Sequence, residues 1–171
     1  MSPAARRRRR IVPGSEFSQT LRSFLEATEV ADRARRVGAA NVPEIADPLL
    51  PQAVDALNDS RPGSVVQVNF RIYDAGGDAA AEFDIVLAGN TEYMTVEFKG
   101  RNLGKHRKYV ANAFDQYWRQ QRASNAPHFG YAPETPARAI ERLNTMTRSG
   151  NPGAAFAYDF SQLIDLIDLL R

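Results

Sequence analysis

Alternating apolar and polar residues mark three neighbouring segments of the chain as β-strands. In residues 65–74, one side of the expected strand carries Val66, Val68, Phe70 and Ile72. The same period of two residues recurs in segments 81–88 and 91–99, and it is the pattern of a half-buried strand. The short connections between the segments are rich in glycine, alanine and asparagine or aspartate. The pattern therefore predicts a three-stranded antiparallel meander.

On both sides of this meander the apolar residues recur at helical spacing. The expected elements are helices over 15–38, 48–60, 105–123, 135–148 and 161–171, and a buried strand over 154–160. A meander with one apolar face has to be covered by other elements. The fold class is therefore expected to be mixed α/β (α+β), with a three-stranded antiparallel meander plus a further strand, flanked by helices.

The length of 171 residues suits one domain, which we place at residues 16–171. Residues 1–15 contain the run Arg6–Arg10 and are expected to be a disordered basic arm or a remnant of cloning sites. No cysteine is present, so a metal site here must use mainly oxygen ligands. The apolar runs are far shorter than the roughly 18 residues of a membrane span, which predicts a soluble protein.

Positive charge is concentrated directly after the meander. The segment from Lys99 to Arg122 contains seven Lys or Arg residues and one acid, Asp115, whereas the chain as a whole has a net charge of +2. Basic residues at the start of a helix oppose the helix dipole, which indicates a demand other than stability. Neutralising nucleic-acid phosphates is such a demand, and a solvated run of charges is the alternative.

The second and third expected strands bring two acids and a lysine to one face. A turn at Gly89-Asn90 places Asp84 diagonal to Glu97, and a turn at Asn90-Thr91 places the two acids directly opposite. In both registers Lys99 joins them, because side chains alternate along a strand. The other face is then a continuous apolar surface made of Phe83, Ile85, Leu87, Met94, Val96 and Phe98.

Two adjacent carboxylates repel each other unless a positive charge lies between them. Mg²⁺ prefers hard oxygen ligands and is usually held by one or two carboxylates together with substrate phosphates. A nearby lysine ammonium can orient or help deprotonate an attacking water and stabilise charge that develops on phosphorus. The alternative is a solvent-facing strand pair in which Glu82, Asp84, Glu97 and Lys99 form ordinary cross-strand charge pairs.

Asp84, twelve further residues and then Glu97-Phe98-Lys99 resemble the motif of the PD-(D/E)xK phosphodiesterase superfamily, which has the restriction-endonuclease-like fold. Phe83 stands where the motif name has proline. The resemblance implies that Asp84 and Glu97 bind Mg²⁺ or Mn²⁺ and that Lys99 is the catalytic lysine. Many members add an acid from the helix before the sheet, for which the candidates are Glu26, Glu29, Glu44 and Asp55. Some carry a glutamine on the helix after the motif, where Gln116 is favoured over Gln120.

The resulting expectation is a metal-dependent endonuclease. Its catalytic residues are Asp84, Glu97 and Lys99, and its nucleic-acid-binding residues are Arg101, Lys105, His106, Arg107, Lys108 and Gln116. DNA is favoured over RNA. By resemblance, short domains of this kind are bacterial toxin effectors that act in the cytoplasm, with delivery from another cell as one route and a cognate immunity protein as partner.

Several alternatives stay open at this point. Within the same fold they are a tRNA-cleaving toxin, a restriction enzyme, a repair nuclease and a junction resolvase. From another class, a non-catalytic module could use the basic helix to bind nucleic acid or an acidic protein. We expect His128 to be structural, and Tyr117 and Trp118 to be core residues more readily than platforms for bases.

Overall fold

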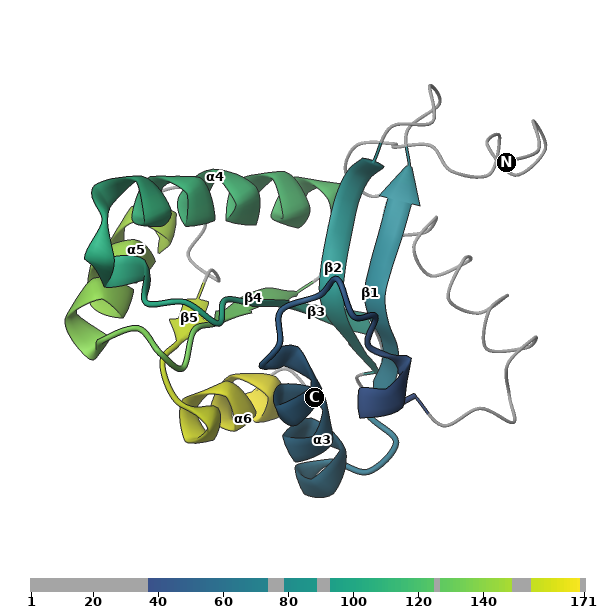
Figure 1. The fold of residues 1–171 in the computed structure, drawn as a ribbon. Coiled ribbons are helices and arrows are strands. Elements are labelled where there is room, and N and C mark those ends of the chain that lie inside the picture. The colour runs from purple at the N-terminus through teal and green to yellow at the C-terminus, as the bar shows by residue number, and fades with distance from the viewer. Residues whose placement is uncertain (1–36, 74–78, 89–92, 125–126, 149–154, 170–171) are drawn as a thin grey trace.

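The computed structural model describes residues 37–73, 79–88, 93–124, 127–148 and 155–169. Within them, four α-helices and a five-stranded sheet follow one another along the chain (Figure 1). The helices are α3 (Leu50–Ser60), α4 (Arg107–Ser124), α5 (Ala137–Arg148) and α6 (Phe160–Leu169). The strands are β1 (Val65–Tyr73), β2 (Ala79–Ala88), β3 (Tyr93–Phe98), β4 (His128–Tyr131) and β5 (Ala155–Ala157). Two short 3₁₀ turns, η1 (Ala39–Asn41) and η2 (Leu103–Lys105), complete the list.

The strands lie in the sheet in the order of the sequence, from β1 to β5. β1, β2 and β3 form the expected antiparallel meander, and β4 and β5 add to it in parallel. In the β2–β3 pair Ile85 lies opposite Val96 and Ala88 opposite Tyr93. This is the second of the two registers considered above, and its continuation places Asp84 opposite Glu97.

Helices cover both faces of the sheet, as Figure 1 shows. On one face, α3 and α6 pack on an apolar core that includes Ile85, Leu87, Val96 and Phe129. On the other face, α4 and α5 enclose a second core around Tyr117, Leu143 and Phe156. The mixed α/β architecture, with a meander, parallel strands and flanking helices, agrees with the expected fold class.

One of the six residues expected on a single apolar face packs elsewhere. Phe83 belongs to a separate cluster with Ala81 and Val86, whereas the other five lie in the core under α3 and α6. The neighbouring strand is irregular at this level: Phe70 of β1 pairs with Phe83, and Asn69 before it has a positive φ of 50°. Non-glycine residues adopt such a φ rarely, and in strands it disturbs the pleat.

The strand β4 was absent from the expected element order, and β5 is shorter than the predicted 154–160. All four residues of β4 are buried, so the segment lacks the alternation that would mark a strand with one solvated face. Phe160, expected in the strand, begins α6 because Asp159 accepts a hydrogen bond from the backbone nitrogen of Gln162 at 2.8 Å. The predicted arm over 1–15 and all but the last two residues of the predicted helix over 15–38 lie outside the described residues.

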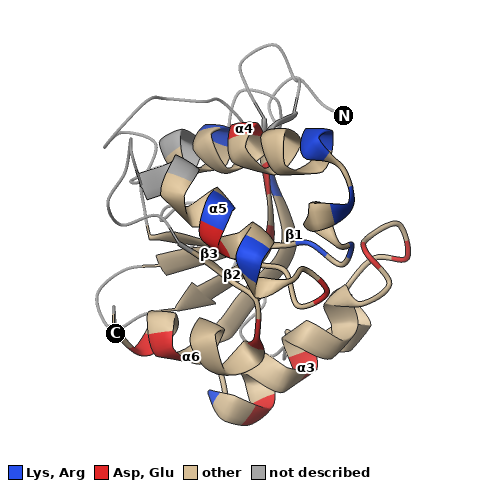
Figure 2. Ribbon diagram, turned by 90° about the vertical axis from the view of Figure 1, so that its left-hand side faces the viewer, with Lys and Arg blue, Asp and Glu red and all other residues tan. Residues whose placement is uncertain are grey.

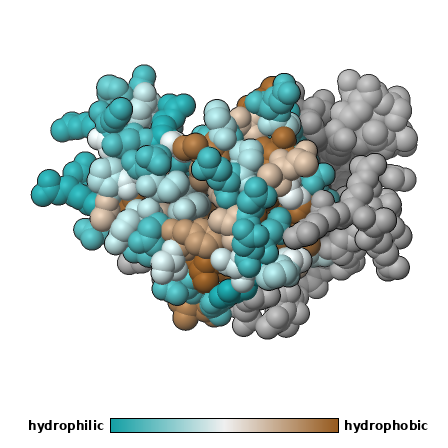
Figure 3. All heavy atoms as spheres, turned by 60° about the horizontal axis from the view of Figure 1, so that its bottom comes forward, coloured by the Kyte–Doolittle hydropathy of each residue, from teal (hydrophilic) through white to brown (hydrophobic). Residues whose placement is uncertain are grey.

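The two helical layers differ in charge: the described spans of α3 and α6 carry acids alone, whereas α4 and α5 carry more basic residues than acids (Figure 2). Over their described spans, α3 and α6 contain no Lys or Arg and carry Asp55, Asp59, Asp165 and Asp168, all exposed. On the opposite layer α4 begins with Arg107 and Lys108, and α5 exposes Arg138 and Arg142. Polar side chains cover much of the lower face, with apolar patches among them (Figure 3). Within the described part of the chain, no helix has both the length and the apolar character that crossing a bilayer requires.

Candidate active site

Asp84 lies at the point where β2 and β3 stop pairing through their backbones. The last backbone pair is Ile85 with Val96, and two residues further along β3 the nitrogen of Phe98 donates to Oδ2 of Asp84 at 2.7 Å. The Asp84 side chain thus accepts the hydrogen bond that a backbone carbonyl of the partner strand would otherwise accept. This contact aims the Asp84 carboxyl group at the end of β3, where the Glu97 carboxyl group lies close enough to raise the pKa of Asp84.

The pair is removed from water. Glu97 is only 4% exposed, so the solvent-facing strand pair considered as an alternative does not describe this site. Burial, followed by the nearby charge of Glu97, raises the pKa of Asp84 from 3.8 to about 8. Near neutral pH Asp84 is therefore mainly protonated. Glu82 stays apart from the pair and is bonded to Arg71 of β1 at 2.5 Å.

Lys99 meets the carboxyl groups from the end of β3. Its Nζ lies 3.0 Å from Oε1 of Glu97 and donates a hydrogen bond to Oε1 of Gln116 on α4. The Lys99 side chain is 20% exposed, which leaves its tip within reach of a ligand. The structure therefore brings together the two acids and the lysine that the sequence singles out.

Both glutamines of α4 contact the site. Besides Gln116, Gln120 donates from Nε2 to Oε2 of Glu97 at 2.7 Å and to the carbonyl oxygen of Glu82 at 2.8 Å. Gln116 and Gln120 are one helical turn apart, so they stand on the same face of α4. Each fixes a different member of the site: Gln116 holds Lys99, and Gln120 holds Glu97.

A further acid comes from the segment before α3. Asp47 accepts hydrogen bonds from the nitrogen of Leu49 at 2.9 Å and from the nitrogen of Gly100 at 3.1 Å. It lines a pocket of about 300 Å³ that Lys99 also lines, and Glu44 and Asp55 are not among its lining residues. The other two proposed acids, Glu26 and Glu29, lie outside the described residues. Asp47 was missed, although it lies three residues before the start of α3, and an aspartate just before a helix is a typical N-terminal signal.

Gly100 makes the approach of Asp47 possible. A Cβ atom at position 100 would lie 2.3 Å from Oδ2 of Asp47. Gly100→Ala is therefore expected to displace the Asp47 carboxylate and lower the free energy of unfolding by about 0.5–1.5 kcal/mol, the contribution of a typical hydrogen bond. Chemical denaturation of Gly100→Ala, Asp47→Ala and the double variant measures this. In the Asp47→Ala background Gly100→Ala should have almost no further effect, and equal effects in both backgrounds would contradict the contact.

The basic residues named from the sequence follow Lys99 along the chain. Arg101, Lys105, His106, Arg107 and Lys108 are all exposed, in the segment from β3 to the first turn of α4. Of these five, Arg101 lines the pocket together with Tyr109 and Asn112 of α4. Tyr109 was not singled out from the sequence, where its spacing favours a core position.

The chain matches no family model, no curated protein and no solved structure. An activity can therefore be inferred only from the residues of this site and their geometry.

The donor set is compatible with a divalent metal ion. Among the described residues no group of three or more acidic, histidine or cysteine side chains is arranged to hold a metal. Two neighbouring carboxylates are nevertheless a sufficient protein ligand set for Mg²⁺ when substrate phosphate and water supply the remaining ligands. The raised pKa of Asp84 is consistent with this, because burial and then the charge of Glu97 disfavour a second negative charge where no cation offsets it. Asp84 and Glu97 would be the ligands.

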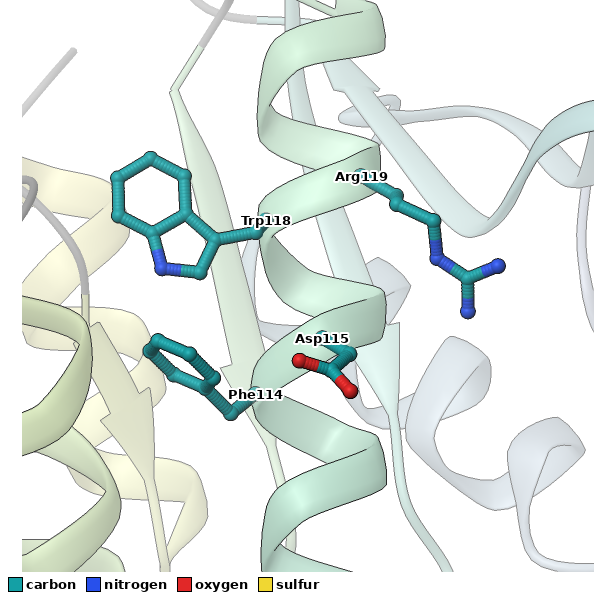
Figure 4. Close-up of a pocket in the computed structure, with 4 residues that line it drawn as sticks. All are labelled: Phe114, Asp115, Trp118 and Arg119. Atoms are coloured by element: carbon teal, nitrogen blue, oxygen red, sulfur yellow. The ribbon is translucent and has the colours of Figure 1, made fainter.

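A larger hollow lies on α4, away from these residues. It measures about 720 Å³ and is lined, among the described residues, by Phe114, Asp115, Trp118 and Arg119 (Figure 4). Phe114 and Trp118 meet edge to face with ring centroids 6.4 Å apart, and one charge of each sign accompanies them. Of its four described lining residues Asp115 alone is a carboxylate, so the candidate site remains the one beside Lys99.

The neighbouring aromatic residue Tyr117 is a core residue. Its side chain is fully buried and its hydroxyl donates to the carbonyl oxygen of His128 at 2.7 Å. His128 is itself buried beside Thr95, with Nδ1 and Oγ1 2.8 Å apart, and burial lowers its pKa to about 3. Both residues are thus packed inside the domain, as expected from the sequence.

Proposed function

We propose that this domain is a metal-dependent nuclease that hydrolyses phosphodiester bonds in nucleic acid, with DNA as the favoured substrate. One observation carries the proposal: Asp84 and Glu97 meet at the end of β3, close enough for Glu97 to raise the pKa of Asp84, and the Lys99 ammonium lies 3.0 Å from Glu97 at the edge of a pocket. The resemblance to the PD-(D/E)xK motif supports the same activity. The basic segment supports a polyanionic substrate, because each lysine or arginine there can neutralise a phosphate.

Each residue has a distinct role in this proposal. Asp84 and Glu97 would hold Mg²⁺ or Mn²⁺, which would supply Lewis-acid stabilisation of charge on the scissile phosphate. Lys99 orients the attacking water and donates hydrogen bonds towards the phosphate oxygens. Gln116 and Gln120 fix the rotamers of Lys99 and Glu97, so that little reorganisation is needed during the reaction.

Metal dependence is the first test. We expect the protein to cleave plasmid DNA when Mg²⁺ or Mn²⁺ is present and to lose this activity in EDTA. Total tRNA, incubated in parallel, distinguishes a deoxyribonuclease from the tRNA-cleaving alternative. A preparation that cleaves equally well in EDTA contains another activity, and a wild-type protein that cleaves neither substrate with either metal contradicts the proposal.

Gel-shift binding in the same samples tests the non-catalytic alternative. A module that merely binds nucleic acid would retard both substrates and leave them intact, whether or not metal is present. The role as a bacterial toxin effector with an immunity partner stays a prediction from the resemblance.

A further inference from the structure

Arg101 is held in place at its backbone, two residues after Lys99. The hydroxyl of the buried Thr135 donates to the carbonyl oxygen of Arg101 at 3.2 Å and accepts from the nitrogen of Leu103 at 3.0 Å. Thr135 is only 4% exposed, and the segment after it leads into α5. The loop that carries Arg101 is thus anchored to the body of the domain.

The side chain of Arg101 is also positioned. Its guanidinium carbon lies 4.9 Å from the centre of the Tyr109 ring, within the range of a cation–π interaction. The Tyr109 ring packs on the core under α4 and meets the His106 ring at 4.9 Å between centroids. Tyr109 therefore gives Arg101 a rigid support at the start of α4.

Arg101 is the positive charge of the pocket that no acid neutralises. Lys99 is paired with Glu97, whereas Arg101 makes no ion pair with any described residue, although both line the pocket. The acid in this pocket, Asp47, already accepts two backbone hydrogen bonds. A supported, unpaired guanidinium next to the lysine is suited to bind a phosphate in a bidentate manner.

We propose that Arg101, supported by Tyr109, binds the phosphate that neighbours the scissile one on the strand being cut. This subsite rests on the nuclease function proposed above and extends it: the substrate must be an oligonucleotide with at least one flanking phosphate. Arg101 contributes binding, and Tyr109 is a positioning residue that acts through it.

Methylphosphonate interference tests the subsite. The substrate is an end-labelled oligonucleotide of the kind that the wild-type protein cleaves, with single neutral methylphosphonates distributed randomly along it. We expect the wild-type protein to cleave a bond poorly when a methylphosphonate replaces the phosphate at one fixed position next to that bond. Arg101→Ala should lower kcat/KM about 10–100-fold, mainly through KM, and should lose this interference, because the charged partner is gone.

Two Tyr109 variants distinguish the contact of the ring with Arg101 from its packing in the core under α4. Tyr109→Phe keeps the ring and should behave as wild type, whereas Tyr109→Leu should raise KM and weaken the interference while thermal unfolding shows a folded protein. Lys105→Ala is the control, since Lys105 is exposed in the same loop but does not line the pocket. It should keep the interference at this position.

The two proposals fail in different ways. If wild type cleaves and Arg101→Ala shows the same interference as wild type, the subsite is wrong and the nuclease stands. Equal behaviour of Tyr109→Leu and Tyr109→Phe removes Tyr109 from the subsite. If wild type cleaves no substrate with either metal, the nuclease function fails, and the subsite fails with it.

Discussion

Replacing Lys99 by glutamine is expected to slow metal-dependent cleavage by about 10²–10⁴-fold, the usual effect of losing a residue that assists proton transfer. Glutamine keeps a hydrogen-bonding tip for Glu97 and Gln116 but carries no charge and exchanges no proton. Single-turnover cleavage of a labelled oligonucleotide measures the chemical step, and circular dichroism with thermal unfolding shows whether the fold is retained.

Lys105→Gln is the matched control, because it removes the same charge from the following loop without touching the site. It should weaken binding slightly and leave the rate at saturating substrate close to wild type. Equal losses in the two variants would mean that Lys99 contributes general positive charge only, and a fully active Lys99→Gln would remove it from the chemistry.

The stability of the metal-free protein should fall as pH rises from about 4 to about 8, and Asp84→Asn should abolish that part of the pH dependence. In the folded protein burial and Glu97 hold the pKa of Asp84 at about 8, whereas the ordinary value is 3.8. Between these values the folded state keeps a proton that the unfolded state has released, so raising pH favours unfolding. Urea unfolding in EDTA across this range measures the free energy directly.

The same carboxyl group should couple metal binding to pH. A cation held by Asp84 and Glu97 would displace the proton of Asp84, so thermal stabilisation by Mg²⁺ or Mn²⁺ should increase with pH until Asp84 ionises unaided. Asp84→Asn should lose most of this stabilisation. Asp165→Asn, an exposed position on α6, serves as control and should show the wild-type profile. A flat wild-type profile would refute the raised pKa.

The shared position of Asp84, Glu97 and Lys99 could be predicted because it depends on local rules of strand geometry. Strand alternation and a short connection put Asp84, Glu97 and Lys99 on one face, and the burial of the opposite face fixed their register. The same rules failed for Phe83, since strict alternation assumes a regular pleat, and the positive φ of Asn69 breaks it.

Contacts between distant segments were beyond the sequence. Asp47 reaches the site only because Gly100 has no side chain, and no spacing rule connects residues 53 positions apart. β4 escaped notice because it is buried on both faces and short, so that it resembles neither an amphipathic strand nor a helix. The helical spacing of Tyr109 favours a core position. Its contact with Arg101 depends on the path of the segment between β3 and α4, which no local pattern predicts.

The unequal charge of the two helical layers has a consequence for encounter with a substrate. Within the described residues the acids of α3 and α6 lie on the other side of the sheet from the basic start of α4. A domain polarised in this way tends to turn in the field of a polyanion, so that collisions are biased towards productive orientations and association quickens at low ionic strength. The aspartates of α3 and α6, although distant from the candidate site, would then repel a polyanion from their own side of the sheet. They would thereby favour its approach to the side that carries the basic start of α4.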